Sequence, residues 1–196
     1  MRSILARERD VAPSLWLELA RLPPDHQLDA IARDGRFHTF GFCELLLAQA
    51  ATAAGTEAGR LAALALAAAE RLDGAVHAAP VVYDLKARAW AQLGEARRTM
   101  DDLPAAEDAL SAAAACLSHG TGDLLVDARL LEFEAAVRAD QGRGGEAEAL
   151  LRQAAARYAQ VNEPDLAARA AARREELRRA ARSDPGSAHL AFGTNS

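Results

Sequence analysis

Small and apolar residues recur at helical spacing along most of the chain, and the clearest example is the stretch 85–117. The first apolar stripe in that stretch consists of Leu85, Ala89, Leu93 and Ala96. Asp101-Asp102-Leu103-Pro104 then interrupts the spacing with a capping carboxylate and a proline that suits a first helical turn. The spacing resumes after Pro104, so the stretch predicts two antiparallel helices joined by a short turn.

The same stretch carries a motif of large and small residues. Trp90, Leu93 and Gly94 form a W-x2-L-G arrangement, and the second helix continues the motif with Ala106, Leu110 and Ala113. This pattern resembles the tetratricopeptide (TPR) repeat of short bacterial proteins, a helix–turn–helix unit that stacks into a solenoid. The resemblance implies that Gly94 and Ala106 lie where the two helices approach each other closely.

Two positions depart from the family pattern. Arg97 stands where the family has an aromatic residue, and Ser118 stands where it has a closing proline. Without that proline, we expect the second helix to continue to about His119-Gly120. A single helix pair leaves one flank uncovered, so it needs a neighbouring pair on at least one side.

Two further helix pairs flank the clear repeat at 80–118. Residues 36–74 predict a degenerate repeat without a Leu-Gly pair, and residues 123–160 predict a third pair. The positions of the clear repeat's second helix recur 41 residues further on as Ala147, Leu151 and Ala154. Because the usual period of the family is about 34 residues, we expect helices that are longer than standard.

The two ends of the chain differ in character. Residues 1–35 predict an N-terminal helical cap whose first helix opens at Pro13 and whose second follows Pro24. The apolar residues of this cap are Leu15, Trp16, Leu19, Leu28 and Ile31. A helix-turn-helix DNA reader is the alternative, but acidic residues stand beside the few arginines of the segment.

The C-terminal part predicts one Arg-rich helix over 165–182 and a flexible tail over 183–196. A solenoid needs a polar-faced terminal helix, and capping is therefore the simpler interpretation of the Arg-rich helix. A basic docking face for an acidic partner is the alternative.

Composition supports an all-helical fold. The 196 residues are 51% hydrophobic but only 5% aromatic, and they are rich in Ala, the strongest helix former. We expect an all-α solenoid of antiparallel helix pairs with about 8–10 helices.

The formal net charge of −5 argues against a general nucleic-acid binder. The chain also lacks a secretory signal or a membrane-length apolar run, so we expect a cytoplasmic protein.

No pattern of reactive residues stands out. The five histidines are scattered, and Asp101-Asp102 is explained by turn and cap chemistry. Cys43 and Cys116 lie in apolar stretches, which predicts buried free thiols rather than nucleophiles. We therefore expect no enzyme activity, no metal and no cofactor.

The family resemblance implies that the first helices of successive pairs line a concave groove. The positions that would face this groove are Arg88, Glu95, Arg98, Arg129, Glu132 and, more loosely, Arg174. Arginine in such a groove holds a carboxylate through two parallel hydrogen bonds. The family's Lys/Asn clamp for a peptide C-terminus is not reproduced, and simple solvated charge is the alternative for each residue.

These observations predict a non-catalytic interaction module that binds a segment of a partner protein in its groove. We expect the partner to be encoded near the gene of this protein, with neither nucleic acid nor membrane involved; self-association stays open. The alternative is a regulatory subunit that senses a peptide or small molecule and acts on a separate effector chain. An enzyme with an unrecognised site is a third, less favoured hypothesis.

Overall fold

The computed structural model describes residues 4–183, and this part of the chain contains nine α-helices, one 3-10 helix and no strand. The elements are α1 Ile4–Leu19, α2 Pro24–Arg33, η1 Gly35–Phe37, α3 Phe40–Ala50, α4 Gly55–Ala69, α5 Ala79–Thr99, α6 Leu103–Leu117, α7 Leu124–Asp140, α8 Gly144–Gln160 and α9 Pro164–Ser183. Successive helices pack on one another from α3 to α6, and α8 packs on α9, so the prediction of an all-α fold of about 8–10 neighbouring helices is confirmed. The chain divides into two compact units, Met1–Val126 and Asp127–Ser196.

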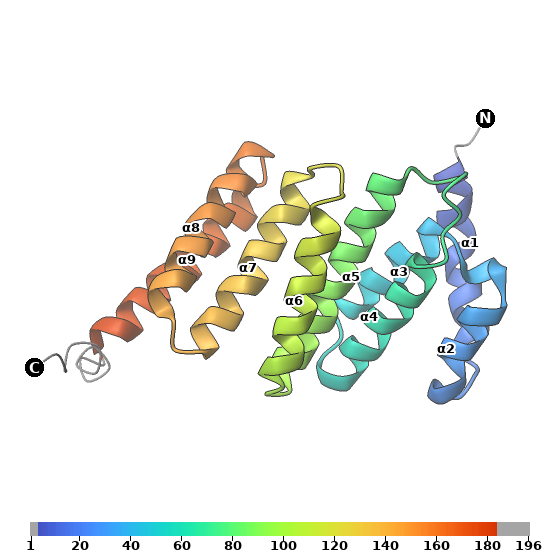
Figure 1. Ribbon diagram of the computed structural model, residues 1–196, viewed down its shortest axis with the longest axis horizontal. Helices are drawn as coiled ribbons and strands as arrows, with labels where there is room; N and C mark the ends of the chain where they lie inside the picture. Colours follow the sequence, from blue (N-terminus) through green and yellow to red (C-terminus); the bar gives the residue numbers. More distant parts are fainter. Residues whose placement is uncertain (1–3, 184–196) are drawn as a thin grey trace, which may run out of the picture. The chain divides into compact units, whose positions relative to one another are not determined.

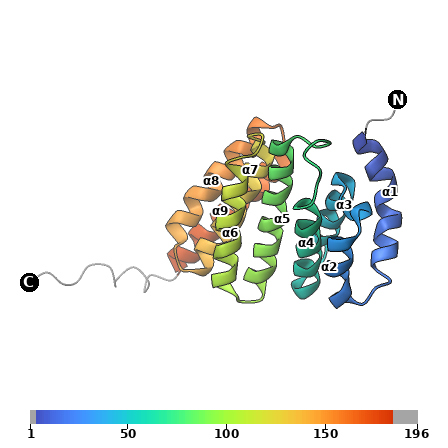
Figure 2. The ribbon, with the colours of Figure 1, turned by 45° about the vertical axis from the view of Figure 1, so that its right-hand side comes forward.

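The first unit is built from two helical hairpins with a helical preface. In Figure 1, α3 and α4 form one hairpin and α5 and α6 form the next; α4 packs on α5. Figure 2 shows α1 at the outer edge of this unit, where it packs on α3. Helix α3 is apolar on most sides, and it is accordingly the most enclosed helix of this core, with Phe42, Cys43 and Leu46 fully buried.

The first helix differs from the prediction. It does not open at Pro13 but runs from Ile4 to Leu19 with Pro13 inside it. A proline inside a helix loses one hydrogen bond, yet here α1 is held along its length by packing on α3. Gly41 makes that approach close, because a Cβ at this position would lie 2.5 Å from the backbone nitrogen of Arg9. Leu28, predicted to cover the repeats, is instead 48% exposed.

The carboxylate of Glu8 joins three segments of the first unit. Its Oε2 accepts hydrogen bonds from the backbone N–H of Phe40, at 2.9 Å, and of Gly41, at 3.3 Å. Its Oε1 lies 3.1 Å from Nε2 of His77 in the loop that precedes α5. The side chains of Glu8 and His77 are both largely buried. One side chain of α1 therefore caps the first turn of α3 and also holds the loop before α5.

Helix α6 ends at Leu117, two to three residues earlier than predicted from the missing proline. The cause is Asp84 of α5, whose carboxylate accepts hydrogen bonds from the backbone N–H of Thr121 at 3.1 Å and from its hydroxyl at 2.5 Å. A Cβ at Gly120 would overlap Oδ1 of Asp84, so glycine is required at this turn. The contact to Asp84, together with the glycine that it requires, thus holds the turn that follows the helix.

The second unit packs α8 against α9, with a small core that includes Ala135, Ala147 and Leu151. Ion pairs join its helices: Arg157 to Asp127 at 2.8 Å, and Arg178 to Glu148 at 2.7 Å. Helix α9 reaches Ser183, the first residue of the predicted tail. The rest of that predicted tail, residues 184–196, lies outside the described residues.

Candidate binding surfaces

The groove residues predicted on α5 are largely satisfied by one another. Arg98 donates two hydrogen bonds of 2.8 Å to the two carboxylate oxygens of Glu95, one turn away. The Arg98 side chain is only 17% exposed, and Arg88 is half-buried on the same helix. A guanidinium that already donates two hydrogen bonds to one carboxylate has few N–H donors left for a ligand. The Glu95–Arg98 pair is therefore a weak candidate for recognition.

A different face of the α5–α6 hairpin carries a hollow of about 260 Å³. Its lining residues are Trp90, Leu93, Arg97, Ala105, Asp108 and Ala109. Trp90 and Leu93 are partly buried against the core and still reach this hollow. Both were predicted only as structural positions of the repeat; their partial exposure follows from how α5 and α6 pack.

The two groove residues predicted on α7 lie close to a buried tyrosine of α8. Tyr158 is fully buried, and its hydroxyl donates a short hydrogen bond to Oε2 of Glu132. Burial, then the hydrogen bond and charge of Glu132, raise the pKa of Tyr158, so the hydroxyl stays protonated. The positive charges of Arg129 and of Arg169 on α9 act on the same pKa in the opposite direction.

These four residues of α7, α8 and α9 form a cluster around Tyr158: Glu132 accepts its hydrogen bond, and the charges of Arg129 and Arg169 act on its hydroxyl. Arg129 and Arg169 are exposed, and neither has an ion pair with any residue between 4 and 183. Glu132 is held at the buried end by Tyr158. The structure thus brings the predicted residues Arg129 and Glu132 together with Tyr158 and Arg169, which the sequence analysis did not select.

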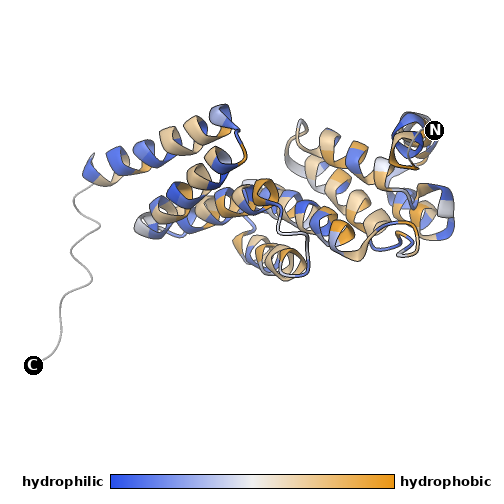
Figure 3. Ribbon diagram, turned by 90° about the horizontal axis from the view of Figure 1, so that it is seen from above, coloured by the Kyte–Doolittle hydropathy of each residue, from blue (hydrophilic) through white to orange (hydrophobic). Residues whose placement is uncertain are grey.

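The last predicted groove residue, Arg174, lies on α9. Its Nε atom is buried and finds no hydrogen-bond partner among residues 4–183. In Figure 3 the last turns of α9, next to the grey C-terminal trace, are coloured hydrophilic. Two of the arginines of α9, Arg173 and Arg182, are exposed. No contact of this structure links Arg174 to a common site with Arg129.

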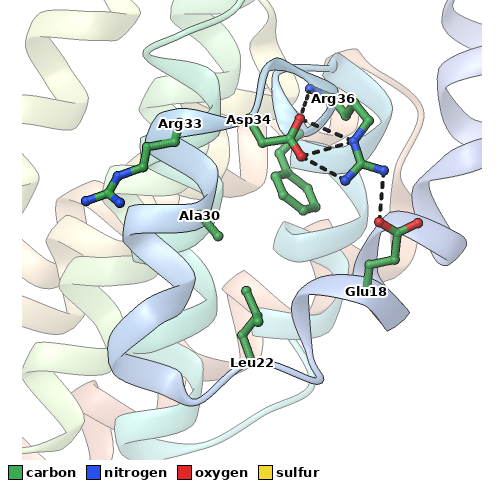
Figure 4. A pocket seen from close by; sticks show the side chains of 7 residues that line it. Glu18, Leu22, Ala30, Arg33, Asp34 and Arg36 are labelled. Carbon is green, nitrogen blue, oxygen red and sulfur yellow. Dashed lines mark hydrogen bonds and ion pairs between the residues drawn. The ribbon is translucent and has the colours of Figure 1, made fainter.

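A second hollow, of about 320 Å³, lies where α1, α2 and η1 meet. Figure 4 shows the guanidinium of Arg36 between the carboxylates of Asp34 and Glu18, with ion-pair distances of 2.8 and 3.0 Å. Arg33 points away from these groups. Leu22, Ala30 and Phe37 supply the apolar wall. No signal in the sequence pattern marked this hollow, which depends on the 3-10 turn capped by Asp34.

The cysteines and possible metal ligands show no reactive arrangement. Burial raises the pKa of the Cys43 thiol to about 12. Cys116 is half-buried rather than buried as predicted, and burial raises the pKa of its thiol as well. Between residues 4 and 183, no group of three or more His, Cys, Asp or Glu side chains is placed to hold a metal ion. None of the helices in this range combines the length and the apolar character needed to cross a bilayer.

Comparison with protein-family models, with curated proteins and with solved structures found no match for this sequence. The TPR resemblance therefore stays a prediction from the sequence motif.

Proposed function

We propose that this protein is a non-catalytic interaction module that binds an acidic segment of a partner protein. The observation that supports it is the pair Arg129 and Arg169, two exposed guanidinium groups from different helices that have no ion pair within residues 4–183. Five of the nine other arginines between 127 and 183 are paired with a carboxylate, such as Arg157 with Asp127.

The charge of the cluster suits a carboxylate. Arg129, Arg169 and the Glu132 carboxylate sum to one positive charge, which matches one carboxylate better than a phosphate of about −2. The hydrogen bond from Tyr158 holds Glu132 at the buried end, so it does not close onto either arginine. Planar guanidinium groups bind carboxylates through parallel hydrogen bonds. An exposed pair contributes at most about 1 kcal/mol, so a partner segment needs several contacts beyond this one.

The test is a charge reversal with a matched control. The double variant Arg129→Glu, Arg169→Glu should weaken binding of an acidic peptide, for example a decamer of Glu and Leu, at least about tenfold in isothermal titration calorimetry. Arg152→Glu changes an exposed arginine of α8 in the same unit, and it should leave the affinity within about twofold. Circular dichroism checks that both variants keep their helicity. Equal loss of binding in the control would refute the assignment to this cluster.

A small-molecule-sensing regulatory subunit is the second candidate, favoured by the 320 Å³ hollow of Figure 4. This volume reaches the lower end of the range for small-molecule sites, about 300–1,000 Å³. Because Asp34, Arg36 and Glu18 satisfy one another, the hollow offers a ligand mainly its apolar wall. Ala30→Leu would fill it. A fractionated metabolite extract would be titrated into the protein and into Ala30→Leu. A heat of binding that is seen with the unchanged protein and lost in Ala30→Leu would favour this candidate over the first.

A further inference from the structure

The hollow on the α5–α6 hairpin combines an apolar lining with unbalanced charge. Trp90 and Leu93 supply the large apolar part of its lining, and Arg97 and Asp108 supply the charged part. Its volume of about 260 Å³ falls below the range of about 300–1,000 Å³ typical of small-molecule sites. The hollow therefore suits a single long side chain of a partner better than a free ligand.

The two charged lining residues, Arg97 and Asp108, differ in their pairing. Arg97 lies 3.7 Å from Asp102, an ion pair in which both side chains are about half exposed. Asp108 is exposed and has no ion pair with any residue in the range 4–183. Together Arg97, Asp102 and Asp108 carry one net negative charge. The unbalanced charge beside the hollow is therefore negative, and a cationic group of a partner would balance it.

The surroundings strengthen this preference. Residues 4–126 contain 11 Lys and Arg against 17 Asp and Glu, a formal charge of −6. Within 95–108, at the tip of the hairpin, 2 basic residues stand against 5 acidic ones. A field of this sign attracts basic segments and repels acidic ones. An exposed aromatic face adds to the attraction, because cations bind over the ring of a tryptophan.

We propose that the α5–α6 hollow binds a basic, amphipathic segment of a partner protein. A Lys or Arg of that segment lays its aliphatic stem over Trp90 and Leu93 and brings its charged end to Asp108. This surface is separate from the Arg129–Arg169 cluster in residues and opposite in charge preference. Binding of a basic segment at the α5–α6 hollow is therefore independent of binding of an acidic segment at the Arg129–Arg169 cluster.

Trp90 serves as its own reporter in the test. The chain has two tryptophans, and Trp16→Phe leaves Trp90 as the only one. A 14-residue Lys/Leu amphipathic peptide titrated into the Trp16→Phe protein should shift the Trp90 emission to shorter wavelength in a saturable manner. The same length of Glu/Leu peptide should produce no shift, because the charge beside the hollow is already negative.

Two matched variants separate direct contact from general attraction. Asp108→Asn should weaken the Lys/Leu peptide about fivefold, the upper range for an exposed ion pair. Asp101→Asn removes the same charge from the hairpin turn outside the hollow, and asparagine tolerates the positive φ of 61° found there. It should change the affinity by less than twofold.

Three results would overturn the proposal. The first is equal weakening by Asp101→Asn and Asp108→Asn, which would show general charge attraction only. The second is a preference for the Glu/Leu peptide. The third is an emission shift on raising the protein concentration alone, together with a dimer mass by light scattering, which would make a second copy the occupant. Loss of Arg129 and Arg169 leaves the Lys/Leu titration unchanged if the two surfaces are separate.

Discussion

Replacing Glu8 by alanine removes the carboxylate that joins α1, α3 and the loop before α5. The side chain of Glu8 is only 13% exposed, and its loss leaves the N–H groups of Phe40 and Gly41 and the ring of His77 without this acceptor. Loss of a helix cap costs about 0.5–2 kcal/mol, and each buried polar group left unpaired costs about 1–3 kcal/mol. Water reaches part of the opened site, so we expect Glu8→Ala to lower the free energy of unfolding by about 3 kcal/mol.

The matched control is Glu44→Ala in the same α1–α3 contact. Glu44 pairs with Arg9 at 2.6 Å, but the Arg9 side chain is more than half exposed. An exposed pair contributes at most about 1 kcal/mol. The loss in free energy of unfolding should therefore be at least about three times larger for Glu8→Ala than for Glu44→Ala. Urea unfolding followed by circular dichroism measures both, and hydrogen exchange on α1 shows whether this helix detaches first. A loss in Glu8→Ala no larger than that in Glu44→Ala would refute the capping argument.

Three further outcomes follow from the packing and the pKa shifts. Gly120→Ala should cost about 1–2 kcal/mol because the new Cβ overlaps the carboxylate of Asp84, whereas Gly74→Ala has open space and should be nearly neutral in urea unfolding. The thiol of Cys43 has a pKa raised from 9.0 to about 12 by burial, so its contribution to stability is complete below pH 9 and declines as pH rises toward 12. Cys43→Ala should reduce that alkaline loss of stability, measured by thermal melts. A thiol reagent at pH 8 should modify half-buried Cys116 well before Cys43. Equal modification rates of the two thiols would contradict the burial of Cys43.

The candidate surfaces were only partly accessible from the sequence. Arg129 and Glu132 follow from repeat position, but Tyr158 lies 26 residues after Glu132 and shows no local signal of the contact. Arg169 joins the same cluster from another helix. Glu95 and Arg98 were selected by the same positional rule, and at a spacing of three residues they bind each other instead of presenting free charge.

By itself, the sequence determined the helices. Apolar and small residues at a period of 3.6 specify amphipathic helices wherever they recur, and the capping carboxylate of Asp102 with Pro104 placed the start of α6 within a residue. Tertiary contacts accompany the two departures from the predicted helix bounds, the continuation of α1 through Pro13 and the end of α6 at Leu117. Packing on α3 carries α1 through Pro13, and Asp84 of α5 turns the chain after Leu117. Local spacing fixes which residues share a helix face, but long-range contacts decide which of those faces are buried, paired or left exposed to a partner.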